Sequence, residues 1–299
     1  MTTGLTMIKR IIFVFLFLFS LHAMAAPVYV STDWLAGKQA DKNVVVVDMS
    51  ASDLQYARFH IPGAVRLPYR ALVKYNKAKK YPVRISNKEL IVLLGRLGIR
   101  RNNHVVIYDD MGGLETGRLF WHLEQIGHPA VSVVDGGLVK WILEGRKVTN
   151  KPVKRLVVVY KVSGKGLMNE ATLADVLKAS HKKSSRLLDV RTIEEYVGDI
   201  RKGRGGHVPG ALLWPWDKSL DIAAGFTRRK SQQLSVGLGK LGIDDKNKPI
   251  IVYCRSGHRA AQSYLVLRSL GFNKVRLYSN SMNEYGSIRT APLRQGTSP

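Results

Sequence analysis

The chain has a single cysteine, Cys254, among its 299 residues. One thiol excludes an internal disulfide, so the fold must be held together by its apolar core. Clustered histidines and cysteines of the kind that hold zinc are also missing. The sequence therefore predicts neither a disulfide framework nor a metal site.

Acidic residues are few: 22 Asp and Glu stand against 47 Lys and Arg, a net charge of +25. Residues 27–150 carry 18 basic and 11 acidic side chains, whereas residues 151–299 carry 27 and 11. The positive field is thus strongest in the half that contains Cys254, where it favours encounter with anions. The basic residues are scattered and no known nucleic-acid motif is present, so we expect no nucleic-acid partner.

Residues 1–25 have the pattern of a secretory signal peptide. Two basic residues precede the apolar run Ile11–Leu21, and Ala23-Met24-Ala25 forms a small-x-small cleavage site. The run is short for a membrane span, so we expect cleavage before Ala26 and no stable membrane insertion of the mature protein. An uncleaved anchor is the alternative. Export to the periplasm or medium makes the unpaired Cys254 a candidate reactive thiol.

The mature chain contains two copies of one sequence plan. Four segments recur in the same order at displacements of 141 to 147 residues. The matched pairs are 45–48 with 186–189, 59–64 with 206–211, 93–99 with 237–243, and 105–109 with 250–254. This pattern indicates a tandem duplication.

Within each copy, short apolar runs alternate with helical patterns, which predicts an α/β fold with a parallel sheet flanked by helices. The predicted organisation is a signal peptide (1–25), an N-terminal domain (26–148), a linker (149–166), a C-terminal domain (167–290) and a tail (291–299). In the second copy the predicted strands are 187–190, 211–213, 250–253 and 274–278, and the predicted helices include 173–179 and 231–241. The pattern leaves open whether 156–162 is a linker or a further strand.

The most informative stretch surrounds Cys254. An apolar, β-branched run ends at Tyr253 and predicts a buried strand, and the next residues predict a tight loop. A helix from Ala261 to Leu270 follows, closed by Gly271 in the C′ position. Backbone N–H groups at the helix start and three nearby basic side chains favour the thiolate form of this cysteine.

This loop resembles the active-site loop of the rhodanese family of sulfurtransferases, in which backbone amides cradle a cysteine persulfide. The segment from Cys254 to Arg259 has the family's six-residue length, whereas a tyrosine phosphatase loop needs an arginine where Ala260 stands. The His-x-Pro-Gly-Ala segments, at His60 and His207, are a second family signature, and we interpret them as turns. The resemblance covers nearly the whole mature chain and implies two tandem rhodanese-like domains.

The resemblance implies specific roles for residues of the second copy. Cys254 is the expected catalytic nucleophile. The expected persulfide cradle consists of the backbone N–H groups of Arg255, Ser256, Gly257, His258, Arg259 and Ala260. The side chains expected to bind the donor are Arg191, Arg255 and Arg259. The alternative role for Arg191 is an ion pair with Glu194 or Glu195. The alternative role for Arg259 is an ion pair with Glu195.

The implied reaction moves sulfur from a small anionic donor to a thiol, sulfite or cyanide acceptor without any cofactor. Arg255 favours thiosulfate over 3-mercaptopyruvate, and a protein sulfur acceptor or reductant is a further expected partner. Two alternatives stay open: a sulfur-carrier protein and a thiol redox module. The first copy has Asp109 in place of Cys254, which predicts a catalytically silent domain. The second copy has no counterpart of Asp135-Gly136-Gly137, which predicts an altered pocket wall.

Overall fold

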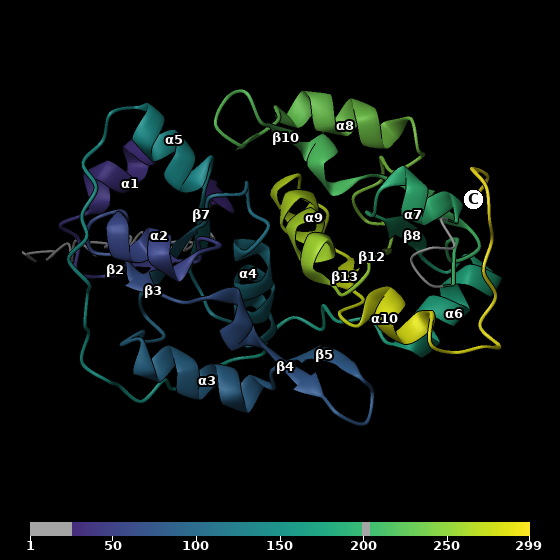
Figure 1. Cartoon of the computed structure of the whole chain (residues 1–299), viewed down its shortest axis with the longest axis horizontal. Helices are drawn as coiled ribbons and strands as arrows, with labels where there is room; N and C mark the ends of the chain where they lie inside the picture. Colours follow the sequence, from purple (N-terminus) through teal and green to yellow (C-terminus); the bar gives the residue numbers. More distant parts are fainter. Residues whose placement is uncertain (1–25, 199–203) are drawn as a thin grey trace, which may run out of the picture.

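The computed structural model describes residues 26–198 and 204–299. They form two α/β domains that lie side by side (Figure 1), as the fold class inferred from the sequence predicted. The predicted signal peptide, residues 1–25, lies outside the described residues. In the part of the chain that is described, no helix combines the length and apolarity needed to cross a bilayer.

The first domain is built on a parallel five-stranded sheet in the order β1-β7-β6-β2-β3. Its core residues point to both faces: α3 and α4 cover one face, and α1 and α5 cover the other. The sheet strands are β1 (Tyr29–Val30), β2 (Val44–Asp48), β3 (Val65–Arg66), β6 (His104–Tyr108) and β7 (Val131–Val134). The helices are α1 (Thr32–Lys38), α2 (Asp53–Arg58), α3 (Asn87–Arg96), α4 (Thr116–Gln125) and α5 (Gly137–Leu143). A hairpin of β4 (Val73–Asn76) and β5 (Tyr81–Arg84) is added.

The second domain repeats this plan with a parallel four-stranded sheet in the order β13-β12-β8-β9. The strands are β8 (Arg186–Asp189), β9 (Ala211–Leu213), β12 (Ile250–Tyr253) and β13 (Val275–Leu277), all at predicted positions to within one residue at either end. The helices are α6 (Leu173–Lys182), α7 (Ile193–Val197), α8 (Ser231–Gly239), α9 (His258–Ser269) and α10 (Ser281–Tyr285). A small hairpin joins β10 (Leu220–Asp221) to β11 (Thr227–Arg228). Gly271 follows α9 with φ +86°, which confirms the predicted C′ cap.

The His-x-Pro-Gly-Ala segments are turns in both domains. His60 Nδ1 lies 2.7 Å from the carbonyl oxygen of Tyr56, and His207 Nδ1 lies 2.9 Å from that of Tyr196. Each imidazole stacks on the ring of the same tyrosine. The glycine of each segment has φ +83°, a conformation that favours glycine. Both histidines are therefore structural, as interpreted from the sequence.

Helices α4 and α9 form the contact between the domains, where apolar side chains of both belong to one continuous core. Gly117 of α4 lies against the backbone of Ala261 in α9, so that a Cβ would come within 2.6 Å of it. Glu124 of α4 accepts hydrogen bonds from Tyr264 and Arg268 of α9. This contact brings the first domain close to the loop that begins with Cys254.

Residues 156–162 are not a strand; they cross the first domain, where the amide of Val158 donates to the carbonyl of Gly95 at 3.0 Å. Tyr160 is buried there, and its hydroxyl lies 2.6 Å from Nδ1 of His128. The other ring nitrogen of His128 lies 3.0 Å from the carbonyl oxygen of Asn103. Since that oxygen can only accept, Nε2 carries the proton of a neutral imidazole and Nδ1 accepts from Tyr160.

Acid should therefore weaken the fold through His128. Burial lowers the pKa of this imidazole to about 4, below the unfolded value of about 6.5. The unfolded chain then takes up a proton more readily than the folded one between those two pH values. We expect a loss of about 3 kcal/mol in unfolding free energy as the pH falls from 6.5 to 4.

Denaturant titrations across this pH range should show a shallower dependence in a His128→Gln variant. The exposed His181 offers the matched control, because His181→Gln should leave the wild-type pH dependence in place. Equal slopes for wild type and His128→Gln would contradict the assignment.

Candidate active site

Cys254 lies directly after β12 and is fully buried. Its amide donates to Ser281 Oγ at 3.0 Å, and its carbonyl accepts from the amide of Met282 at 3.1 Å. Both partners are at the start of α10, so this helix holds the backbone of the cysteine in place. The thiol is therefore presented at the carboxyl end of a central strand, where open α/β sheets place their ligand sites.

One backbone amide of the loop is directed at the sulfur. The amide of Gly257 lies 3.1 Å from Cys254 Sγ and donates to it. Gly257 is the N-cap of α9 with φ +80°, and no side chain caps this helix end. The first N–H groups of a helix have no partner within it and carry the positive end of the dipole. The sulfur thus faces donors that can stabilise negative charge.

The first domain contains the same kind of loop with a carboxylate in place of the thiol. Asp109 follows β6 and is almost fully buried. Its two carboxylate oxygens accept hydrogen bonds of 2.9 to 3.1 Å from the amides of Met111, Gly113, Glu115 and Thr116. Burial raises the pKa of Asp109, and these four amides oppose that rise. The duplicated loop therefore holds a buried acidic group with backbone amides alone.

The two loops differ at the residue that supports them. In the first domain Gly137, with φ +50°, lies against Asp109, and in the second domain Ser281 has φ +51° at the equivalent place. Its hydroxyl accepts from the Cys254 amide and donates to the carbonyl of Tyr278. The missing Asp-Gly-Gly segment is thus replaced by a serine that hydrogen-bonds the backbone of Cys254 and holds a backbone conformation that is rare for non-glycine residues.

Two of the predicted donor-binding arginines are engaged by carboxylates. Arg259 forms a bidentate pair with Glu195, with N–O distances of 2.6 and 3.0 Å. Arg191 is almost fully buried, and its Nε and Nη2 bond Asp189, at 2.9 and 2.6 Å, while Nη2 also reaches the carbonyl of Gly206. The structure therefore places Arg259 beside Glu195, which is the alternative role inferred for Arg259 from the sequence. Roles of both arginines in donor binding stay predictions.

Arg255 and His258 of the loop differ in their surroundings. Arg255 is exposed to solvent. His258 Nε2 lies 3.3 Å from Glu115 Oε1, and its ring lies 4.1 Å from that of Tyr69. Glu115 and Tyr69 belong to the first domain, so this domain forms part of the wall around the loop.

A contribution of the first domain to the pocket wall could be expected from the sequence, but the residues that provide it, Arg118 and Tyr69, were not predicted. Arg118 of α4 donates through Nη2 to the carbonyl of Ser256 at 3.2 Å and to Tyr69 Oη at 3.3 Å. Burial raises the pKa of Tyr69, and Arg118 partly offsets this rise. One signal was available: Arg118 is a charged residue directly before the apolar run Leu119–Trp121 of a buried helix.

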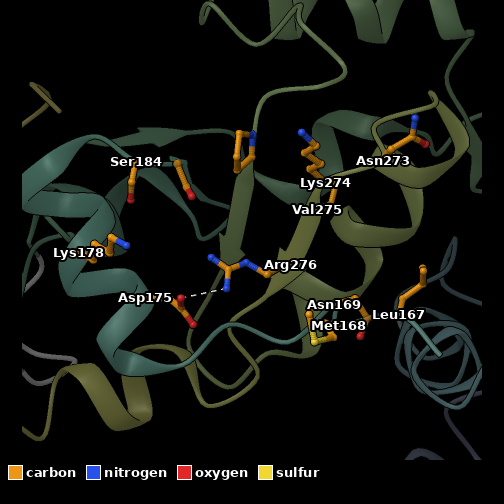
Figure 2. Close-up of a pocket in the computed structure, with 12 residues that line it drawn as sticks. Leu167, Met168, Asn169, Asp175, Lys178, Ser184, Asn273, Lys274, Val275 and Arg276 are labelled. Atoms are coloured by element: carbon orange, nitrogen blue, oxygen red, sulfur yellow. Dashed lines mark ion pairs between the residues drawn. The ribbon is translucent and has the colours of Figure 1, made fainter. Parts of the chain in front are cut away.

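The large surface pocket shown in Figure 2 is elsewhere. Ser185, Pro249 and Lys274 line it, and each directly precedes one of the parallel strands β8, β12 and β13. It therefore lies at the amino ends of these strands, opposite the edge that carries Cys254. Among residues 26–198 and 204–299, no group of three or more His, Cys, Asp or Glu side chains is placed to hold a metal ion.

Comparison with known proteins places this geometry in a family. The model of the rhodanese-like domain matches twice, at residues 31–144 and 172–287. A Thermus thermophilus protein named sulfur carrier protein TtuD is 32% identical over 283 residues, which cover 90% of this chain and 97% of that protein. A Mycobacterium bovis protein named "Putative thiosulfate sulfurtransferase 1" is 31% identical over 280 residues, covering 90% and 98%.

Among solved structures, the 3-mercaptopyruvate sulfotransferase SseA of Escherichia coli is similar with a TM-score of 0.75 and 26% identity, over 86% of this chain and 99% of that one. Sequence relatives and fold therefore agree across both halves of the chain. With two tandem copies of its domain, the chain belongs to the rhodanese family of sulfurtransferases.

Proposed function

We propose that this protein is an exported sulfurtransferase that carries sulfane sulfur on Cys254, with thiosulfate or a related anion as the donor. One observation carries the proposal: the only cysteine is buried at the N-terminus of α9 with a backbone amide on its sulfur. The Asp109 loop supports it, because the same design there holds a buried acidic group. Export rests on the sequence of residues 1–25.

In the proposed reaction the Cys254 thiolate attacks the outer sulfur of thiosulfate. A bond forms between the two sulfurs, the S–S bond within thiosulfate breaks, and both of its electrons leave with sulfite. The persulfide so formed carries one negative charge, which faces the amides at the start of α9. Cyanide, sulfite or a thiolate then takes the outer sulfur and restores the thiolate. Arg255, exposed beside the loop, is the proposed first contact for an anionic donor.

A second candidate is a sulfur carrier that passes its persulfide only to a partner protein. The similarity to the protein named sulfur carrier protein TtuD supports it.

One experiment separates the candidates: the purified protein receives thiosulfate, intact mass is recorded, and cyanide is then added while thiocyanate is measured. A gain of one sulfur and rapid thiocyanate formation are expected for the sulfurtransferase. A stable adduct with thiocyanate formed no faster than without protein would favour the carrier. No adduct from thiosulfate or 3-mercaptopyruvate would overturn both, and disulfide formation with oxidised glutathione would then indicate a thiol redox module.

A further inference from the structure

Arg118 is an arginine of the first domain whose guanidinium lies in the active site of the second. The residue is 1% exposed. Nη2 donates to the carbonyl of Ser256, two residues after the nucleophile. The same nitrogen lies 2.8 Å from the point that a Cβ on Gly257 would occupy. The guanidinium is therefore packed directly against the loop that surrounds Cys254 Sγ.

The rest of this guanidinium has no hydrogen-bond partner. Nε and Nη1 are both buried and unpaired within the described part of the chain. Three carboxylates of the domain contact have other partners: Glu124 pairs with Arg268, Glu170 pairs with Arg84, and Glu115 lies 3.3 Å from the imidazole of His258. A buried arginine without a countercharge is costly. Such a group is stable when an anion shares its site.

We propose that Arg118 binds the anionic end of the sulfur donor through N–H groups of Nε and Nη1 that have no other partner. This assignment rests on the proposed function. Hydrogen bonds from a guanidinium to an oxyanion are charge-assisted, and the sulfonate of thiosulfate presents oxygens that can accept them. As the outer sulfur moves to Cys254, the same guanidinium stabilises the departing sulfite. Donor recognition would then require both domains, although only one carries the nucleophile.

The test compares Arg118→Met and Arg118→Lys with wild type. Loss of hydrogen bonds to a charged group predicts a KM for thiosulfate raised about 10- to 100-fold in Arg118→Met, with a smaller change in kcat. Arg118→Lys keeps the charge but loses the several N–H donors of the planar guanidinium, so its KM should be intermediate. Sulfate, an unreactive dianion, should compete with thiosulfate in the wild type and lose affinity in Arg118→Met.

The matched control is Arg268→Met, which removes an ion pair across the same domain contact without reaching the loop. Its KM for thiosulfate and its inhibition by sulfate should match the wild type. If Arg118→Met does not fold, Arg118→Lys provides the test. Its kcat/KM must fall more for dianionic thiosulfate than for monoanionic benzenethiosulfonate.

Unchanged KM and sulfate inhibition in a folded Arg118 variant would overturn the inference while leaving the proposed function intact. Absence of sulfur loading in the wild type would instead remove the proposed function itself. A purely structural role of Arg118 predicts that kcat/KM falls equally for thiosulfate and benzenethiosulfonate.

Discussion

Replacing Cys254 by serine is expected to abolish sulfur loading and to lower the rate of sulfur transfer at least about a thousandfold. No other thiol exists in the chain, and a serine hydroxyl cannot form the persulfide. The fold should survive the change, because Ser281 and Met282 bond only the backbone of residue 254. The serine oxygen can also accept from the Gly257 amide.

Intact mass after incubation with thiosulfate, together with thiocyanate formation, checks this expectation. A thermal unfolding curve close to that of the wild type should accompany the loss. If the serine variant still gained a sulfur atom, the nucleophile would be another group and the site would be wrongly assigned.

A Gly257→Ala substitution should be the most disruptive conservative change in the loop. The residue has φ +80°, and a Cβ there would overlap the carbonyl oxygen of Ser279 and lie 2.8 Å from Arg118 Nη2. Strained backbone and overpacking together predict a loss of about 3 kcal/mol in stability. Displacement of the amide that donates to Cys254 Sγ predicts a rate about a hundredfold lower or worse.

Gly210→Ala is the matched control for this change. Gly210 has nearly the same φ, +83°, but a Cβ there would meet nothing within 4 Å. Gly210→Ala should therefore lower the unfolding free energy only by the cost of the strained backbone, about 1–2 kcal/mol. Sulfur transfer should be unchanged. Chemical denaturation and turnover of both variants would test the difference; similar behaviour of the two would mean that steric contact at Gly257 is unimportant.

Much of the site could be predicted because its parts are neighbours in sequence. The β12 strand, Cys254, the loop and α9 follow one another without interruption, so local periodicity and turn residues predict where the thiol lies. One detail differs: α9 begins at His258, three residues earlier than predicted. The missing capping side chain at Gly257 explains this, since the usual sequence signal for a helix start is absent.

Arginine partners were harder to predict, since several carboxylates lie within reach in sequence. Arg191 has Asp189, Glu194 and Glu195 nearby, and the structure places its guanidinium on Asp189. Arg259 pairs with Glu195 across 64 residues. The pair of Arg259 with Glu195 depends on how α7 lies beside α9, which no local pattern states.

By itself the sequence determined the duplication and the α/β fold of each copy, and it predicts a silent first loop and a single nucleophile. These features are encoded in contiguous segments, where local conformation follows from side-chain pattern. Only the tertiary structure decided that Arg118 and Tyr69 of the first domain line the site of the second. That juxtaposition arises from the packing of α4 on α9. Because this packing depends on shape matching between residues about 140 positions apart, it has no signature in either segment alone.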